Sequence, residues 1–288
     1  MSYDLYLRKR DGRFDEAAVL DWFRGRPLYQ VESRQAIYSS ADTGVYSVFD
    51  LRSSSDEDYD VHFYLNYFRP SYFVLEAEPE VTALVRTFDF IVTDPQINGM
   101  GEDHYDGQGL IASWTRSLEV TLPGFLRDPA TRQNLHTLPT TRLAEIWRWN
   151  HGRRALQEEI GDHFFVPRIL FLRIDGQTQT AIVWGDGIPM LLPKVDLIVV
   201  HRQQLAPWRL FGRRPNQALM SWADMTALVE PCTTPHASGA LLLTYDQPPK
   251  PLADRLRSLP TLTVKPGVLA ADAVLDREMV ERALAVQQ

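Results

Sequence analysis

The chain of 288 residues contains a single cysteine, Cys232, and no run of about 18–20 apolar residues that could cross a membrane. One cysteine excludes both an intrachain disulfide and a cysteine cage for a metal, which favours a reducing compartment. The opening residues, MSYDLYLRKR, alternate between polar and apolar, so they lack the basic and then apolar pattern of a signal peptide. We therefore expect a cytoplasmic protein that does not associate with membranes.

The sequence also lacks the common motifs of catalysis and nucleotide binding. Neither G-x-x-x-x-G-K-[ST] nor G-x-G-x-x-G occurs, and there is no G-x-S-x-G nucleophile motif. Cys232 stands between prolines and threonines without a recognisable catalytic pattern. We expect no catalytic residue, no cofactor and no bound metal, which favours a protein that is not an enzyme.

Apolar and aromatic residues are abundant, at 44% hydrophobic with 13 phenylalanines, 11 tyrosines and 7 tryptophans. This composition supports real cores and argues against disorder. The length suits one large domain or two ordinary ones. We therefore expect a folded chain throughout most of its length.

The net charge of −7 is distributed unevenly along the chain. Residues 1–125 hold 11 basic and 21 acidic residues, whereas residues 126–288 hold 19 and 16. The acidic part argues against nucleic acid as a direct ligand, because neutralising phosphates requires Lys and Arg. It favours a basic protein partner attracted over long range, and the alternative is charge that serves solubility alone.

The hydrophobic periodicity of the first part predicts a β-α-β-β-β-α-β order. Such an order indicates a largely antiparallel sheet with helices on one face, an α+β fold. The predicted elements are a strand at 3–8, a helix at 14–23, strands at 29–38, 44–52 and 59–69, a helix at 78–87 and a strand at 88–92.

A long helix is predicted at 141–160, and strands and helices follow it in a second pattern. We expect an acidic α+β sheet domain at 1–125, a helical connector at 126–161 and a C-terminal α+β domain at 162–288. The expected fold class is therefore α+β, with an N-terminal antiparallel sheet joined by a long helix to a second, mixed α/β domain.

The clearest alternation is that of Asp60 to Arg69, DVHFYLNYFR. Its apolar residues point one way, and its aromatic and polar residues point the other. Neighbouring strands repeat this second set, and Tyr38 is expected to share the same face. A Tyr-rich polar face is typical of an interaction surface, although an ordinary solvated sheet face is the alternative. The candidate binding residues are Tyr6, Arg34, Tyr46, Asp50, Asp60, His62, Tyr64 and Asn66.

Two other groups of residues raise a catalytic or metal-binding alternative. The loop Glu102 to Gly107 contains carboxylates and a histidine, although acids before a helix start explain it more simply. His151 lies on the long predicted helix beside two tryptophans. The competing hypothesis is a hydrolase or transferase that uses His104, Asp106 or His151 between the two domains. An adaptor of a secretion machine is the third possibility.

One segment of the second half combines basic and aromatic residues: Arg202, Trp208, Arg209, Phe211, Arg213 and Arg214. Such a mixture can stack on bases or bind phosphate. Because the segment is small, we favour its pairing with the acidic first half, within the chain or between chains.

The opening strand SYDLYL, residues 2–7, and the block YLNYFRPSYF, residues 64–73, resemble those of uncharacterised bacterial cytoplasmic proteins. Some such proteins resemble immunity partners of antibacterial toxins. The resemblance covers about the first third of the chain. It implies a non-enzymatic protein that binds a cognate toxin and neutralises it.

Overall fold

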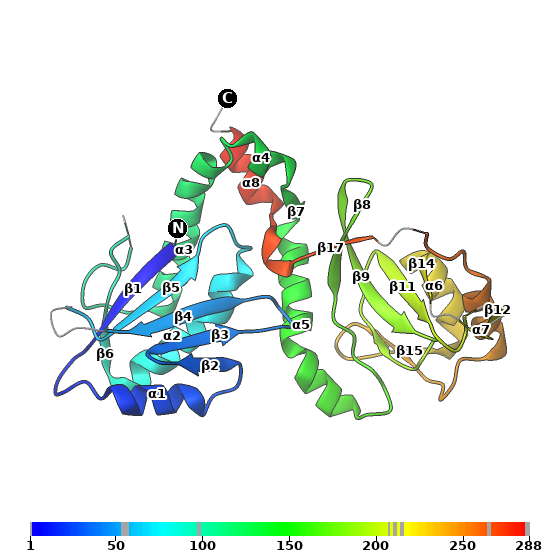
Figure 1. Cartoon of the computed structure of the whole chain (residues 1–288), viewed down its shortest axis with the longest axis horizontal. Helices are drawn as coiled ribbons and strands as arrows, with labels where there is room; N and C mark the ends of the chain where they lie inside the picture. Colours follow the sequence, from blue (N-terminus) through cyan, green and yellow to red (C-terminus); the bar gives the residue numbers. More distant parts are fainter. Residues whose placement is uncertain are drawn as a thin grey trace. The chain divides into compact units, whose positions relative to one another are not determined.

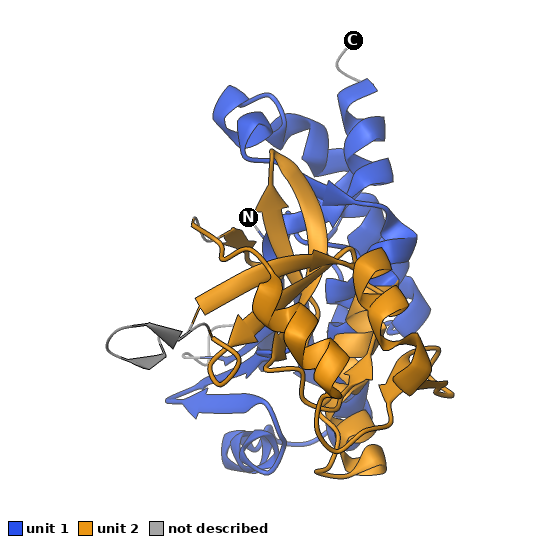
Figure 2. Ribbon diagram, turned by 90° about the vertical axis from the view of Figure 1, so that its right-hand side faces the viewer, with its two compact units in different colours: residues 1–144, 272–288 blue, residues 145–271 orange. Residues whose placement is uncertain are grey.

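The computed structural model describes residues 2–52, 58–96, 99–206, 208–209, 212–213, 216–263 and 266–285. The chain has a mixed α+β fold, which confirms the predicted class. It divides into two compact units, shown in blue and orange in Figure 2. Unit 1 comprises residues 1–144 and 272–288, and unit 2 comprises residues 145–271. Within the described ranges, no helix is both long enough and apolar enough to cross a membrane.

This division does not follow the expected boundaries at residues 125 and 161. The C-terminal segment belongs to unit 1 because β18 (Val274–Asp276) pairs in parallel with β7 (His136–Leu138). Helix α8 (Arg277–Ala285) then packs against α3 (Gly107–Phe125). The expected connector helix, α5 (Thr140–Ile160), begins in unit 1 and continues into unit 2.

The uneven distribution of charge also holds when the residues are grouped by the two structural units. Unit 1 holds 16 basic and 26 acidic residues, whereas unit 2 holds 14 and 11. The formal charges are therefore −10 and +3, as they were for the two parts of the sequence.

A six-stranded sheet forms the centre of unit 1 (Figure 1), with the strand order β2-β3-β4-β5-β1-β6. Every neighbouring pair is antiparallel. The strands are β1 (Ser2–Lys9), β2 (Tyr29–Glu32), β3 (Gln35–Ser39), β4 (Tyr46–Leu51), β5 (Val61–Asn66) and β6 (Phe90–Thr93).

One face of this sheet is the core of unit 1, and α1 (Glu16–Arg24) and α2 (Tyr72–Phe88) cover it. Phe23 of α1 packs against Phe49 of β4 with ring centroids 5.0 Å apart. On α2, the buried Glu76 accepts a 2.9 Å hydrogen bond from the hydroxyl of Tyr38. The alternate residues of each strand point to the opposite face, which we call the open face.

The predicted strand at 29–38 is in fact the hairpin β2–β3. Ser33 and Arg34 form its turn, and Ser33 has a φ of +52°. Because the chain reverses there, Glu32 pairs with Gln35 and the alternation changes phase. Tyr38 therefore lies in the core at 4% exposure, and its expected place on the open face was wrong.

A buried carboxylate at the end of β6 connects three parts of unit 1. Asp94 accepts hydrogen bonds from the hydroxyl of Tyr3 at 2.6 Å, from Oγ of Ser113 at 2.8 Å and from the N–H of Met100 at 3.0 Å. These donors come from β1, from α3 and from the loop between β6 and α3. Hydrogen bonds to a buried charge are among the stronger ones, so Asp94 fixes α3 against the sheet.

Unit 2 contains a five-stranded sheet with the order β14-β11-β9-β8-β17. Strands β9 and β11 are parallel, and the other pairs are antiparallel. The strands are β8 (Leu170–Ile174), β9 (Gln177–Gly185), β11 (Leu197–Arg202), β14 (Asn216–Ser221) and β17 (Gly267–Leu269). The predicted turn at Asp175 and Gly176 joins β8 to β9, and both residues have a positive φ, as this type of hairpin requires.

Smaller elements complete unit 2. They are α6 (Trp222–Val229), α7 (Lys250–Ser258) and a three-stranded sheet of β10 (Leu191–Leu192), β16 (Leu241–Leu243) and β15 (Thr233–Pro235). Helix α5 is fixed to this unit by the buried Asn150, whose amide exchanges two hydrogen bonds with the backbone of Ile169, at 3.0 and 2.9 Å.

Candidate binding surface

The open face of unit 1 places four of the predicted binding residues beside one another. His62 of β5 lies opposite Tyr6 of β1 and opposite Asp50 of β4. Tyr64 follows His62 by two residues and therefore shares its face. All four side chains are partly exposed.

A compact cluster surrounds His62. Its Nε2 lies 2.9 Å from Oδ1 of Asp4, and its ring stacks on Tyr6 with centroids 4.9 Å apart. The rings of Tyr64 and Tyr59 lie 5.4 and 6.0 Å from the same imidazole. We call these five residues, Asp4, Tyr6, Tyr59, His62 and Tyr64, the His62 cluster. It offers flat aromatic surface, phenol hydroxyls and a carboxylate in a fixed arrangement, which suits protein recognition.

The phenol of Tyr64 remains protonated at neutral pH. Partial burial, together with the negative charges of Asp50 and Asp4, raises the pKa of Tyr64 above its usual range. The hydroxyl therefore stays available as a hydrogen-bond donor. Asp50 also accepts a 3.3 Å bond from Nε2 of Gln35, which extends the polar surface onto β3.

Tyr46 and Asn66 form a separate group at the other end of the face. The Tyr46 hydroxyl accepts hydrogen bonds from Nδ2 of Asn66 at 2.8 Å and from Nη2 of Arg69 at 2.6 Å. Arg69 also pairs with Asp272 at 3.4 Å. These predicted residues therefore connect the sheet to the C-terminal segment of unit 1.

Asp60 and Arg34 lie outside the cluster. Asp60 precedes β5, its side chain is 6% exposed, and it accepts a 2.7 Å bond from the N–H of Lys9 while pairing with Arg52 at 3.4 Å. Arg34 lies in the β2–β3 turn and pairs with Glu16 of α1 at 3.1 Å. The side chains of Asp60 and Arg34 therefore make contacts within unit 1 that strand alternation alone does not reveal.

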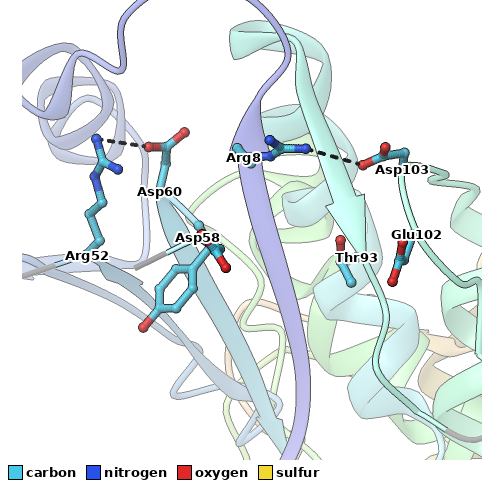
Figure 3. Close-up of a pocket in the computed structure, with 8 residues that line it drawn as sticks. Arg8, Arg52, Asp58, Asp60, Thr93, Glu102 and Asp103 are labelled. Carbon is cyan, nitrogen blue, oxygen red and sulfur yellow. Dashed lines mark ion pairs between the residues drawn. The ribbon is translucent and has the colours of Figure 1, made fainter. Parts of the chain in front are cut away.

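A polar pocket of about 440 Å³ adjoins the His62 cluster and shares Tyr59 with it. Arg8 and Thr93 belong to the same alternation as Tyr6, so the pocket lies at one end of the open face. Figure 3 shows the Arg52–Asp60 pair and the Arg8–Asp103 pair on opposite sides of it. The lining residues are Arg8, Arg52, Asp58, Tyr59, Asp60, Thr93, Glu102 and Asp103.

Sequence reasoning did not select Asp4 or Tyr59. Asp4 alternates with Tyr6 on the opening strand, so the pattern contained the signal that places it on the open face. Tyr59 precedes β5, and no periodicity fixes the direction of a residue outside a strand. Its contact with Tyr6, at 5.0 Å between ring centroids, appears only in three dimensions.

The residues of the catalytic alternative have structural or exposed positions. Asp106 caps α3 by accepting a 2.8 Å bond from the N–H of Gly109, which supports a helix-start role for this acidic loop. His104 is exposed, and so is His151, whose ring lies 5.5 Å from Trp147. In the part of the chain that the structure describes, no three His, Cys, Asp or Glu side chains are placed to hold a metal.

The basic and aromatic segment of unit 2 includes one residue with a clear structural role. Arg202 is fully buried, and its Nη1 donates to the carbonyls of Leu256, Arg257 and Leu259 at the end of α7, at 2.8–3.1 Å. Burial lowers the pKa of its guanidinium. Arg202 therefore caps a helix and is unavailable to a ligand. The side chains of residues 207–215 lie outside the described part of the chain.

Comparison of the chain with models of protein families, with curated proteins and with solved structures found no match. The resemblance to immunity proteins therefore stays a prediction.

Proposed function

We propose that this protein binds a basic protein partner through the open face of unit 1, with the His62 cluster at the centre of contact. The observation that carries this proposal is the cluster itself. Three tyrosines and a histidine are held together on a sheet face that α1 and α2 leave uncovered. Tyrosine is enriched in protein interfaces because its ring supplies contact area and its hydroxyl supplies a hydrogen bond.

The charge of unit 1 supports a basic partner. Asp4 and Asp50 flank His62 on the face, within a unit whose formal charge is −10. A field of this sign accelerates association with a basic surface and disfavours acidic ones.

The finer proposal is an immunity protein that neutralises a bacterial toxin in the cytoplasm. Its support is the resemblance of residues 2–7 and 64–73. The first segment lies in β1, and the second begins in β5, the two neighbouring strands that carry Asp4, Tyr6, His62 and Tyr64. Many nuclease toxins are basic, which suits an acidic partner.

The proposal is tested by capture from native lysate with two immobilised variants beside the wild type. Asp50→Lys combined with Tyr64→Ala alters the face, whereas Glu281→Lys makes a matching charge reversal on the exposed side of α8 in the same unit. We expect wild type and Glu281→Lys to capture one basic protein, identified by mass spectrometry, that the face variant loses. Equal capture by all three proteins would overturn the assignment of the face.

Neutralisation is tested separately by expressing the captured protein in a sensitive host. We expect growth to stop, and co-expression of the wild-type chain, but not of the face variant, to restore it. A captured protein that never affects growth would contradict the immunity role and leave the binding role standing.

A further inference from the structure

We propose that Nδ1 of His62 accepts a hydrogen bond from a cationic N–H donor of the partner, so that the partner binds the neutral imidazole and is released when His62 is protonated. This inference rests on the proposed binding function, and it adds the chemistry of the central contact and the pH dependence of that contact. The observation that carries it is the position of the Asp4 carboxylate against one nitrogen of the His62 ring.

Asp4 determines which nitrogen of the neutral His62 ring carries the proton. Its Oδ1 lies 2.9 Å from Nε2 of His62. An ionised carboxylate only accepts hydrogen bonds, so Nε2 is the donor in this contact. A neutral imidazole has a single N–H, and Nδ1 therefore carries a lone pair and is an acceptor.

The His62 ring is held in place while Nδ1 remains accessible. The Tyr6 ring stacks on it with 18° between the two planes, and the Tyr59 ring meets it edge-on. Nδ1 has no hydrogen-bond partner among the residues that the structure describes, and it is not one of their buried polar atoms. The side chain as a whole is 23% exposed. Nδ1 therefore reaches solvent and can accept a hydrogen bond from outside the chain.

The surroundings of this acceptor favour a cationic donor. Asp50 lies directly opposite His62 on β4, and Asp4 lies on β1 at the other side. A lysine ammonium or an arginine guanidinium that donates to Nδ1 makes a charge-assisted hydrogen bond. It is also attracted through space by the two carboxylates, without having to contact either of them. A neutral donor lacks this second contribution.

Protonation of His62 removes both advantages. The imidazolium has an N–H at each nitrogen, so Nδ1 becomes a donor and no longer accepts a hydrogen bond. The ring also gains a positive charge that repels the cation. The partner and the proton therefore compete for His62, and binding of the partner weakens as the pH falls.

The other groups around His62 belong to types that do not change charge between pH 5.5 and 8. Those that face it are Asp4 and Tyr6 of β1, Asp50 of β4, Tyr64 of its own strand and the preceding Tyr59. Histidine is the side chain that titrates in this range, whereas carboxyls and phenols ordinarily do not. Burial and nearby carboxylates raise the pKa of Tyr64 farther from it. Arg8 and Arg52, two positions after Tyr6 and after Asp50, stay charged and pair with Asp103 and Asp60.

The position of the proton is tested without the partner. Long-range proton–nitrogen spectra of the isotopically labelled full chain at pH 8 distinguish the two ring nitrogens of His62. We expect the proton on Nε2, and we expect Asp4→Ala to move the shifts of both nitrogens, whereas the exposed Glu281→Ala leaves them unchanged. A proton on Nδ1 would overturn the inference, and unchanged shifts in Asp4→Ala would refute the positioning role of Asp4.

The pH dependence is tested by calorimetric titration of the captured partner at pH 8 and pH 5.5. His62→Gln leaves a neutral side chain that does not titrate, and His104→Gln removes an exposed histidine of the same unit as a control. We expect wild type and His104→Gln to bind about tenfold or more weakly at the lower pH. His62→Gln should bind more weakly than wild type at pH 8 and change by less than about threefold between the two values.

An equal pH dependence in all three proteins would overturn the inference, because a group other than His62 would then be responsible. Binding through the open face that does not change with pH would also overturn it, and the proposed function would stand. A partner that binds equally well to Asp50→Lys with Tyr64→Ala would instead contradict the proposed function, so the two failures are distinguishable.

Discussion

The carboxylate of Asp276 accepts hydrogen bonds from both the backbone N–H and Oγ of Ser71, each 2.7 Å long, across 205 positions of sequence. Ser71 is the N-cap residue of α2, and its own side chain makes no capping bond. The C-terminal segment therefore supplies the negative charge at the start of the helix that covers the sheet. Together with the pairing of β18 and β7, this contact accounts for the place of residues 272–288 in unit 1.

Replacing this carboxylate should destabilise unit 1. Asp276 is 1% exposed, and Asp276→Ala leaves the partly buried N–H of Ser71 without its acceptor. We expect a loss of about 2–3 kcal/mol in the free energy of unfolding of unit 1. Hydrogen exchange of α2 peptides measures it, and the exposed Glu281→Ala should change it by less than about 0.5 kcal/mol. Unchanged protection of α2 would contradict the capping role.

Glu278 accepts two hydrogen bonds from Thr140 at the start of α5, and this contact predicts that the stability of the fold depends on pH. Hydrogen bonds from Oγ1 of Thr140 at 2.7 Å and from its N–H at 2.9 Å lower the pKa of Glu278 below its usual 4.5. The folded state favours the ionised form, so the contribution to stability is present above pH 4.5 and disappears as the pH falls through the lowered value. We expect wild type to melt above Glu278→Gln at neutral pH and the two melting temperatures to converge in acid. A constant difference across this range would refute the linkage.

The buried guanidinium of Arg202 should be essential to unit 2. Arg202→Met removes the donor to three carbonyls at the end of α7, and the hydrogen bonds lost at Leu256 and Leu259 are buried. We expect a cost of about 3 kcal/mol or more, seen as loss of protection in α7 peptides by hydrogen exchange. Arg255→Met, on the exposed side of the same helix, is the control and should be nearly neutral. A mild effect at Arg202 would mean that water replaces the guanidinium.

The sequence predicted the fold class and most strands of unit 1, because alternation in segments such as DVHFYLNYFR reflects burial on one sheet face. The prediction from alternation failed at Ser33 and Arg34, where a two-residue turn without glycine or asparagine reverses the chain. The side chain of Tyr38 therefore faces the core and not the open face. The return of the C-terminal segment depends on contacts between residues distant in sequence, such as the pairing of β18 with β7 and the bond from Ser71 to Asp276, which local patterns do not encode.

The candidate site was predictable only where it lies within strands. Tyr6, Asp50, His62 and Tyr64 follow from alternation, and the structure places them side by side. Asp60 follows the same pattern, but its carboxylate already binds the N–H of Lys9 and the guanidinium of Arg52. Both partners lie outside the segment that begins at Asp60, so the alternation of this segment does not reveal these contacts.

The affinity of the captured partner tests the central claim most directly. Calorimetric titration compares wild type, Asp50→Lys with Tyr64→Ala, and the charge-matched Glu281→Lys. If the His62 cluster is the centre of contact, the face variant should bind about 30-fold or more weakly, and the control should stay within about threefold of wild type. Equal weakening in both variants would show that net charge alone drives binding, and unchanged affinity in the face variant would show that the partner binds elsewhere.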